Sequence, residues 1–458
     1  MHAMKPSIRR SIGSITLSLL LGVQYVQAIS LDVQSTDSIK SAAKIVADEM
    51  VSYYTGYRPG DVPGNLPAPY YWWEAGAMFG ALIDYWYFTG DDTYNAITTQ
   101  ALLHQVGPGN DFMPPNQTKT EGNDDQAFWG MAALSAAENN YPNPPEDQPQ
   151  WLALAQAVFN TQAARWDTTS CGGGLKWQIF SFNGGYNYKN TISNGCFFNM
   201  GSRLAVYTGN QTYADWADRM WDWCSAIGLR NDQYFFYDGS DDTLNCTALD
   251  HLQWTYNAGT FLVGAANMYN FTNGSQIWEE RINGIISGIN TIFLKNNIIV
   301  EQACEEVQTC NIDQRSFKAY LARWIAATIV RAPFTYAQLK PILETSAQAA
   351  ASVCTGGDKG TSCGLRWNFG SFDGSTGVGE QMSALEVIQS NLITVAPGPV
   401  TEVTGGTSKG DPSAGTTSDI GPGDLHKEAV TTADKAGAAI VTVLICLVIM
   451  GGAWWMVV

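Results

Sequence analysis

The sequence predicts an all-α fold in which six helical hairpins close into a toroid, an (α/α)6 barrel. Two observations point to it. Between residues 37 and 392, apolar residues recur at helical spacing in twelve stretches, whereas only three short stretches resemble strands. A motif with an aromatic helix start, a glycine one turn later and a Thr-Gly type stop also recurs, and its spacing fits a unit of about 60 residues, one pair of helices.

Twelve helices are expected in order along the chain. The first, 39–55, shows the pattern well, because Ile39, Ala43, Val46, Met50 and Tyr53 share one face and Gly56 ends it. The others cover 70–88, 91–106, 123–138, 149–166, 193–207, 211–227, 250–270, 275–292, 313–329, 336–353 and 378–391. The strand-like stretches, 176–182, 234–237 and 298–300, are too few and too short to build the core.

The recurring motif favours closure of the ring. Its copies are Trp72–Gly76 with the stop Thr89-Gly90, Phe197–Gly201 with Thr208-Gly209, and Trp254–Gly259 with Thr272–Gly274. A second echo, Gly174–Trp177 against Gly364–Trp367, is offset by 190 residues, which is close to three such units. Six helical pairs without obvious capping repeats favour a closed ring over an open solenoid.

In such a ring every second helix runs the same way inside, so six helix N-termini meet at one mouth. Polar and aromatic residues gather at these starts: Trp72-Trp73-Glu74, Asp124-Asp125, Asn194 with Phe197-Phe198, Gln253-Trp254 with Tyr256-Asn257, Arg315 with Lys318, and Glu380-Gln381. Helix N-termini favour negative charge, and aromatic faces stack on the apolar faces of sugar rings. The sequence therefore predicts a cleft with sugar-binding chemistry.

Asp124 and Asp125 are the candidates for chemistry in this cleft. They stand where Gly122-Asn123 gives way to an apolar run, so we place them in the first turn of a helix. Two acids in unequal surroundings can serve as an ionised nucleophile and a protonated acid. Capping alone is the alternative, because Asp pairs are common at helix starts and the chain has two more, at 91–92 and 241–242.

Both ends of the chain indicate secretion. Residues 1–28 have the basic start, apolar run and small residues of a signal peptide, with cleavage expected after Ala28. We expect the catalytic domain at 29–395 and, at 396–435, a disordered stalk rich in Gly, Pro, Ser and Thr that carries a GPI attachment region. Residues 436–458 lack charge and are expected to be a hydrophobic tail removed on attachment; a tail-anchored protein is the alternative.

The cysteines and sequons fit this compartment. Cys446 lies in the tail, and the remaining eight cysteines form an even set that suggests disulfides. Short loops favour Cys304–Cys310 and Cys354–Cys363, which leaves Cys171–Cys196 and Cys224–Cys246 by elimination alone. N-glycosylation sequons occur at Asn116, Asn210, Asn245, Asn270 and Asn273.

Charge and motif content exclude several classes of function. The net charge of −17 makes a nucleic-acid partner improbable, because phosphate binding needs basic patches. His104 and His251 have no metal-ligand spacing, and the sequence contains no P-loop or dinucleotide fingerprint. We therefore expect neither a metal nor a cofactor.

The segments Gly122–Trp129, Trp72–Gly76 and Gln253–Asn257 resemble glycoside hydrolase family 76, in particular the fungal GPI-anchored mannan endo-1,6-α-mannosidases of the cell wall. The similarity covers about residues 31–395, and both terminal signals match. The resemblance implies an (α/α)6 barrel and retaining cleavage of α-1,6-mannosidic bonds, with Asp124 as the nucleophile and Asp125 as the acid/base. It also implies transfer of GPI-linked glycoproteins onto wall glucan, with a GPI core or α-1,6-mannan as the donor.

For these roles we expect backbone N–H groups and the helix dipole to keep Asp124 ionised, and partial desolvation to keep Asp125 protonated. Candidate platforms for sugar rings are Trp73, Trp129, Trp177, Tyr256 and Trp367, for each of which core packing is an equal alternative. Candidates for binding sugar hydroxyls or an anionic GPI phosphate are Asn194, Asn257, Arg315 and Lys318, with helix-end hydrogen bonding as the alternative.

The expected function is therefore an endo-acting α-1,6-mannosidase on the outer face of the plasma membrane and in the cell wall, working as a transglycosidase. Plain endo-hydrolysis is an open alternative, because the outcome depends on how an acceptor competes with water. A non-catalytic mannan-binding or structural wall protein is the alternative of another class.

Overall fold

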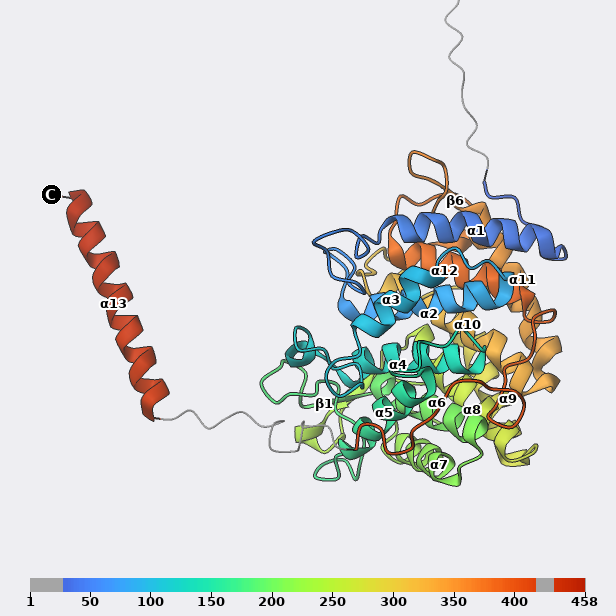
Figure 1. Ribbon diagram of the computed structural model, residues 1–458, viewed down its shortest axis with the longest axis horizontal. Coiled ribbons are helices and arrows are strands. Elements are labelled where there is room, and N and C mark those ends of the chain that lie inside the picture. The colour runs from blue at the N-terminus through green and yellow to red at the C-terminus, as the bar shows by residue number, and fades with distance from the viewer. Residues whose placement is uncertain (1–27, 417–431, 458) are drawn as a thin grey trace, which may run out of the picture.

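The structure is a computed structural model that describes residues 28–416 and 432–457 (Figure 1). Apart from Ala28, the predicted signal peptide lies outside the described residues. The described chain forms twelve helices around one core, and a thirteenth, α13 (Thr432–Val457), stands apart from them in Figure 1. Each of the twelve helices expected from the sequence is present.

Six of these helices form an inner ring. Along the sequence, inner and outer helices alternate. Each inner helix packs against the next, and the last packs against the first, so the ring closes. The inner helices are buried almost all round, which is why their apolar pattern is less one-sided than that of a surface helix. They are α2 (Trp72–Thr89), α4 (Asn123–Glu138), α6 (Thr191–Thr208), α8 (Thr255–Phe271), α10 (Phe317–Arg331) and α12 (Val378–Gln389).

The outer layer covers this ring. It consists of α1 (Thr36–Ser52), α3 (Asn95–His104), α5 (Trp151–Ala164), α7 (Gln211–Ala226), α9 (Gln276–Ile292) and α11 (Tyr336–Ser352). The stops predicted for α2 and α6 are confirmed, because Gly90 and Gly209 cap these helices with φ of 75° and 68°, in the left-handed region that glycine adopts freely. The predicted (α/α)6 barrel is confirmed.

The strands are short and lie in loops. Strands β1 (Tyr188–Asn190), β2 (Gly239–Asp241) and β3 (Leu249–Asp250) form one antiparallel sheet, and the pairs β4 (Leu294–Lys295) with β5 (Ile298–Ile299) and β6 (Cys354–Gly356) with β7 (Ser362–Cys363) form hairpins. The expected strand 298–300 is confirmed as β5. The expected strands 176–182 and 234–237 are wrong, because in these loops Gln178 and Phe236 make only isolated bridges, to Gly122 and Arg230.

Single 3-10 turns complete the described chain. They are η1 (Thr118–Thr120), η2 (Asp242–Leu244), η3 (Gln314–Ser316), η4 (Pro333–Thr335), η5 (Trp367–Phe369) and η6 (Ser390–Leu392). The turn η3 matters for the cleft, because it precedes α10 and changes which residues of the predicted helix 313–329 face the mouth of the ring.

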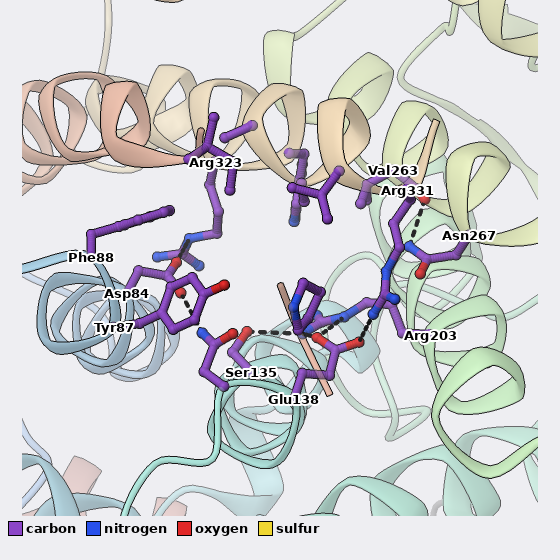
Figure 2. A pocket seen from close by; sticks show the side chains of 17 residues that line it. Asp84, Tyr87, Phe88, Ser135, Glu138, Arg203, Val263, Asn267, Arg323 and Arg331 are labelled. Atoms are coloured by element: carbon purple, nitrogen blue, oxygen red, sulfur yellow. Dashed lines mark hydrogen bonds and ion pairs between the residues drawn. The ribbon is translucent and has the colours of Figure 1, made fainter. Parts of the chain in front are cut away.

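The C-terminal ends of the inner helices surround a cavity of about 640 Å³, which we call the rear cavity (Figure 2). Ion pairs between different helices cross it. Arg203 Nη2 on α6 lies 2.6 Å from Glu138 Oε2 on α4, and Arg323 on α10 pairs with Asp84 on α2 through Nε at 2.9 Å. Arg331, also on α10, reaches Glu138 Oε1 at 3.5 Å. Arg331 is the last residue of α10, where the helix dipole also favours a cation. These ion pairs link different inner helices at the rear of the ring.

Residues 396–416, which we call the strap, correct the predicted boundary at residue 395. The strap crosses the rear of the ring, where the Val400 N–H donates to the Glu138 carbonyl at 2.8 Å and the Glu402 N–H to the Tyr207 carbonyl at 2.9 Å. It then follows α5, where the Leu152 N–H donates to Ser408 Oγ at 2.9 Å. The prediction of a disordered stalk is therefore wrong for residues 396–416, while residues 417–431 lie outside the described residues.

The predicted hydrophobic tail coincides with most of α13. Within the residues that the structure describes, no helix combines the length and the apolar character that crossing a membrane requires.

The disulfides agree with the prediction in part. Cys304–Cys310 and Cys354–Cys363 are confirmed. The pairs Cys171–Cys196 and Cys224–Cys246 are wrong, because Cys171 bonds to Cys246. Cys196 in α6 and Cys224 in α7 are free thiols buried in the helical core, so the assumption that all eight cysteines pair was mistaken.

Candidate active site

The N-terminal ends of the inner helices surround a cleft of about 820 Å³ at the mouth opposite the rear cavity. The starts of α2, α4, α8 and α10 contribute to its lining, together with the loops around β1 and β2. The lining residues are Trp73, Asp124, Asp125, Phe128, Trp177, Tyr188, Asn190, Asp238, Leu252, Trp254, Tyr256, Asn311, Asp313, Gln314 and Phe317. Carboxyl groups and aromatic rings therefore share one open space, as the sequence predicts.

The start of α4 presents the two acids side by side. Gly122 is the N-cap, and its N–H donates to Asp125 Oδ2 at 2.7 Å, so Asp125 makes the half of a capping box that its own side chain can supply. Both carboxyl groups are half-buried and line the cleft. Glycine is needed at 122 for close approach, because a Cβ there would collide with Asp124 Oδ1 and lie 3.1 Å from the Trp177 carbonyl oxygen.

The surroundings of the pair favour protonation. Desolvation, and then the charge of Asp125, raise the pKa of Asp124 well above its ordinary value. Desolvation also raises the pKa of Asp125 to about 6, against the lowering effect of the Gly122 N–H. Two carboxylates this close cannot both ionise easily, so near neutral pH the pair holds one proton between them.

The two acids have unequal surroundings in this structure. We expected backbone N–H groups to favour ionised Asp124, and the N–H groups of Asp124 and Asp125 do lower its pKa, but desolvation outweighs them. The Gly122 N–H donates to Asp125 instead, and Asp124 Oδ1 is buried without a hydrogen-bond partner within the described residues. In the unliganded cleft, Asp125 is thus the more readily ionised acid. The reason is the capping box, which turns the third residue of the helix, not the second, back toward the N-cap.

A third carboxyl group, on Asp313, faces the pair across the cleft. Its charge raises the pKa of Asp125, and its Oδ1 accepts the Trp73 indole N–H at 3.0 Å. Sequence reasoning placed Arg315 and Lys318 at this helix start and missed Asp313, as it missed Asp238 and Tyr188, which lie outside any helix. The predicted helix start at residue 313 was the available signal for Asp313.

Three of the predicted sugar platforms reach the cleft. Trp73, Trp177 and Tyr256 line it, and Tyr256 lies flat on Phe317, with ring centroids 3.8 Å apart. Two others are wrong, because Trp129 and Trp367 are buried in the core. Trp129 packs between Trp72 and Phe112, and Trp367 lies under the Lys318 ammonium group, 3.8 Å from the ring centroid.

The predicted polar contacts to sugar are mostly structural. Asn194 is buried and holds the backbone of Leu175, accepting its N–H at 2.7 Å and donating to its carbonyl at 2.9 Å. Asn257 is also buried and does not line the cleft. Lys318 is fully buried, with its Nζ 2.7 Å from Glu305 Oε1. Asn194, Asn257 and Lys318 are therefore wrong as cleft residues, and hydrogen bonding inside the fold accounts for Asn194 and Lys318.

Arg315 points to a neighbouring hollow of about 610 Å³ instead of the cleft. This hollow and the cleft share one segment as their common wall: Cys310 and Arg315 line the hollow, whereas Asn311, Asp313 and Gln314 line the cleft.

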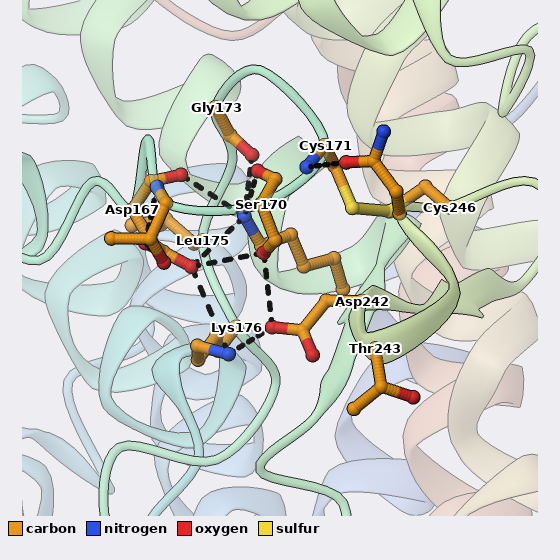
Figure 3. A network of polar contacts seen from close by, with 12 residues as sticks. Asp167, Ser170, Cys171, Gly173, Leu175, Lys176, Asp242, Thr243 and Cys246 are labelled. Carbon is orange, nitrogen blue, oxygen red and sulfur yellow. Dashed lines mark hydrogen bonds and ion pairs between the residues drawn. A yellow bond between two sulfur atoms is a disulfide. The ribbon is translucent and has the colours of Figure 1, made fainter.

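A polar network holds the loop that carries Trp177 (Figure 3). The fully buried Lys189 donates to the carbonyls of Asp167, Ser170 and Gly173 at 3.0, 2.9 and 2.7 Å. Lys176, next to Trp177, pairs with Asp242, and the Cys171–Cys246 disulfide joins the same two loops. The network therefore fixes one wall of the cleft relative to the paired acids.

The remaining predictions concern modification and metals. All five sequon asparagines are exposed, so their glycosylation stays a prediction that the structure allows. Within the described residues, no cluster of three or more His, Cys, Asp or Glu side chains could hold a metal ion.

The closed helical ring, with adjacent acids in an aromatic cleft, defines a carbohydrate-processing enzyme of the barrel class. Residues 38–403 match the family described as Glycosyl hydrolase family 76, so the chain belongs to that family and is a glycoside hydrolase.

Fungal proteins are similar over almost the whole chain. "Mannan endo-1,6-alpha-mannosidase DCW1" of Saccharomyces cerevisiae is 48% identical over 443 residues, which are 96% of this chain and 98% of that protein. "Mannan endo-1,6-alpha-mannosidase DFG5" of the same organism is 45% identical over 98% of each chain.

Solved structures agree with the fold. Dfg5 from Chaetomium thermophilum, determined in complex with glucosamine, is 46% identical, has a TM-score of 0.82, and aligns with 86% of this chain and 98% of its own. The alpha-1,6-mannanase GH76A of Salegentibacter sp. HEL1_6, as an inactive variant with alpha-1,6-mannotriose, has a TM-score of 0.62 at 16% identity and aligns with 77% of this chain and 99% of its own.

Proposed function

We propose that this chain is a retaining endo-α-1,6-mannosidase of the cell surface, with Asp124 as the nucleophile and Asp125 as the acid/base. The observation that carries the proposal is the pair of adjacent, half-buried acids lining an aromatic cleft at the start of α4. The names of relatives up to 48% identical supply the substrate class. The inactive Salegentibacter variant also changes two consecutive aspartates to asparagine, which is a parallel to the pair here.

In the first step the Asp124 carboxylate attacks C1 of the mannosyl unit. The bond between C1 and the glycosidic oxygen breaks, its electron pair goes to that oxygen, and Asp125 gives the oxygen its proton. The products are a mannosyl ester on Asp124, a shortened chain with a free hydroxyl, and an ionised Asp125. In the second step Asp125 takes a proton from water or from an acceptor hydroxyl, whose oxygen attacks C1 and releases Asp124.

The first step requires one ionised and one protonated carboxyl group, and a pair that holds a single proton provides both. In the empty cleft the proton favours Asp124, because Asp125 accepts the Gly122 N–H. Positive charge that develops on the sugar ring beside Asp124 favours its ionised form, so the proton can move to Asp125 and then to the leaving oxygen. Because the pKa of Asp125 is about 6, we expect kcat/KM to fall below this pH as the pair takes up a second proton.

We further propose that the natural second step is transfer, with a mannose-containing glycan of a GPI-linked protein as the donor and cell-wall glucan as the acceptor. The predicted signal peptide and terminal tail would place the enzyme, through a GPI anchor, where both partners lie. Competition between the acceptor hydroxyl and water at the mannosyl ester decides between transfer and hydrolysis.

Product analysis tests this proposal. The full chain is incubated with a linear α-1,6-mannotetraose or a synthetic GPI glycan, with and without a glucan oligosaccharide, and the products are identified by mass spectrometry and proton NMR. We expect internal cleavage with the α-anomer formed first, and a mixed mannosyl–glucan product when the acceptor is present. A β-anomer formed first would overturn retention, and the absence of a mixed product would leave hydrolysis as the function.

A further inference from the structure

The hollow next to the cleft is a polar depression on the same mouth as the paired acids. Its lining includes Glu305, Cys310, Arg315, Arg366 and Asp373. Only the segment from Cys310 to Arg315 separates it from the cleft, and the Cys304–Cys310 disulfide fixes that segment. A chain-like ligand that lies in the cleft can therefore extend over this wall.

Two guanidinium groups in the hollow are poorly partnered. Arg315 Nη1 lies 3.4 Å from Glu380 Oε1, and its Nε donates to the Cys310 carbonyl at 3.3 Å, both of them long contacts. Arg366 rests on the Phe369 ring, 4.5 Å from the centroid, and forms no ion pair with any residue that the structure describes. Most of the N–H groups of both side chains are thus free to donate to a ligand.

The hollow also offers an acceptor that needs a donor. Glu305 is 2% exposed, and its Oε1 pairs with buried Lys318 at 2.7 Å. Its Oε2 has no hydrogen-bond partner in the described part of the chain, and leaving such an acceptor unpaired is costly. A ligand that fits must therefore bring hydrogen-bond donors as well as acceptors.

This combination favours a sugar over an oxyanion. A phosphate group near neutral pH would satisfy the arginines, but it brings few donors for Glu305, and the carboxylates of Glu305, Asp373 and Glu380 would repel it. A hexose has hydroxyl groups that accept from Arg315 and Arg366 and donate to Glu305. It carries no charge, so the nearby carboxylates do not oppose it.

We propose that this hollow binds one hexose unit of the glycan that occupies the cleft, at a distance from the cleaved bond. The inference rests on the proposed function, because it assigns a second subsite to the same carbohydrate chain. The unit belongs either to the mannan donor or to the acceptor, and the hydrogen-bonding chemistry is the same for both.

The first test measures binding without turnover. Calorimetry compares the affinity of an α-1,6-mannohexaose and of a glucan hexaose for the Asp124→Asn variant of the full chain, with and without Arg366→Met. Loss of hydrogen bonds from a charged donor predicts about ten-fold weaker binding of at least one of the two glycans. Arg219→Met is the matched control, because Arg219 is an exposed arginine that lies 4.2 Å from the centroid of the Trp216 ring on outer helix α7.

The second test measures catalysis with otherwise unmodified chains. With Arg366→Met we expect kcat/KM to fall about ten-fold for long α-1,6-manno-oligosaccharides, or for transfer to the glucan acceptor, but less than about two-fold for the shortest substrate that is cleaved. If kcat/KM falls only for long donors, the hexose unit in the hollow belongs to the donor. If it falls only for transfer, the unit belongs to the acceptor.

The inference is overturned if Arg366→Met changes neither the binding of either glycan nor the length dependence, in a variant whose thermal midpoint equals that of the parent. Inhibition by inorganic phosphate that Arg366→Met abolishes, without any effect on glycan length, would identify an anion site and also overturn it. Failure of the proposed function looks different, because the parent would then cleave no α-1,6-mannoside at all, while the calorimetric result still decides on the subsite.

Discussion

Asp124 Oδ1 is buried without a hydrogen-bond partner in the described part of the chain, whereas Asp125 Oδ2 accepts the Gly122 N–H. Neither acid forms an ion pair with a basic side chain among the described residues. Both therefore occupy positions where ionisation costs free energy in the folded state, and the proposed mechanism uses this cost because one proton stays on the pair near neutral pH.

Replacing Asp124 should stabilise the fold in a pH-dependent way. An unfolded Asp has a pKa near about 3.9. Desolvation raises the pKa of Asp124 in the folded chain, so Asp124 ionises at a lower pH in the unfolded chain than in the folded one. The folded state therefore loses stability as the pH rises above the pKa that Asp124 has in the unfolded chain. We expect Asp124→Asn to raise the thermal midpoint, followed by circular dichroism, at about pH 7 and to leave it unchanged at about pH 3.5. An equal change at both pH values would contradict this account, and exposed Asp92→Asn is the control.

The Gly122→Ala variant should lose activity and keep its fold. The added Cβ would collide with Asp124 Oδ1 and so displace the carboxyl group from its place beside Asp125. A displacement of about 1 Å in a reacting group can lower the rate about 100-fold, and we expect a loss of that order in kcat/KM. Gly184→Ala, where a Cβ meets nothing within 4 Å, should retain parental activity. Full activity of Gly122→Ala would show that the position of Asp124 is not critical.

Sequence reasoning found the mouth of the ring that holds the cleft but placed several side chains there wrongly. The helix starts are set by local patterns that a single sequence contains, so Asp124 and Asp125 were found. Which side of a start faces the cleft depends on neighbouring helices and on the turn η3, so Lys318 was placed in the cleft although it is buried against Glu305. Asp313, five residues earlier, takes that place.

At the scale of the element, the start of α5 is capped by a segment that lies far away in the sequence. Its N-cap residue Gln150 provides no side-chain cap, and the Leu152 N–H donates to Ser408 of the strap, 256 residues away. A segment rich in Gly, Ser and Thr has no apolar period, so composition indicated disorder. The strap is ordered by hydrogen bonds to helix ends, and no local sequence pattern predicts these bonds.

Ser408→Ala should therefore destabilise the barrel without affecting the cleft. The change leaves the buried Leu152 N–H without its acceptor, which costs about 1–3 kcal/mol in the free energy of unfolding. Urea unfolding measures the cost, and kcat/KM per folded molecule should equal that of the parent. Ser413→Ala is the matched control, since Ser413 is exposed and its Oγ donates to nearby Asp411 Oδ1. Equal stability of the two variants would show that the strap does not cap α5.

At the scale of the whole molecule, the two ends of the ring carry different kinds of charged groups. The N-terminal mouth carries acids and aromatic rings, and the C-terminal end carries arginines paired with Glu138, Asp84 and Glu386. Because all six inner helices run the same way, their dipoles favour anions at the first end and cations at the second. This arrangement could be predicted in outline from the repeat, but the pairing of the arginines could not, since it joins residues of different helices that lie far apart in the sequence.

Glu138→Gln should loosen the rear of the barrel. It removes the carboxylate shared by Arg203 and Arg331 and leaves two buried guanidinium groups without a counter-charge. Breaking a buried pair in this way costs about 3–5 kcal/mol, which urea unfolding can measure. Exposed Glu146→Gln should be neutral. If Glu138→Gln unfolds at the same urea concentration as the parent, the rear ion pairs do not stabilise the ring.

The central claim is that the two adjacent acids at the start of α4 carry the chemistry of the whole ring. It is tested most directly by kcat/KM of the Asp124→Asn and Asp125→Asn variants on α-1,6-mannotetraose, beside Asp92→Asn. The account predicts that each cleft variant loses at least about 1,000-fold while remaining folded, and that Asp92→Asn stays within about two-fold of the parent. Activity within about ten-fold of the parent in a folded cleft variant would contradict it and leave that aspartate as a helix cap.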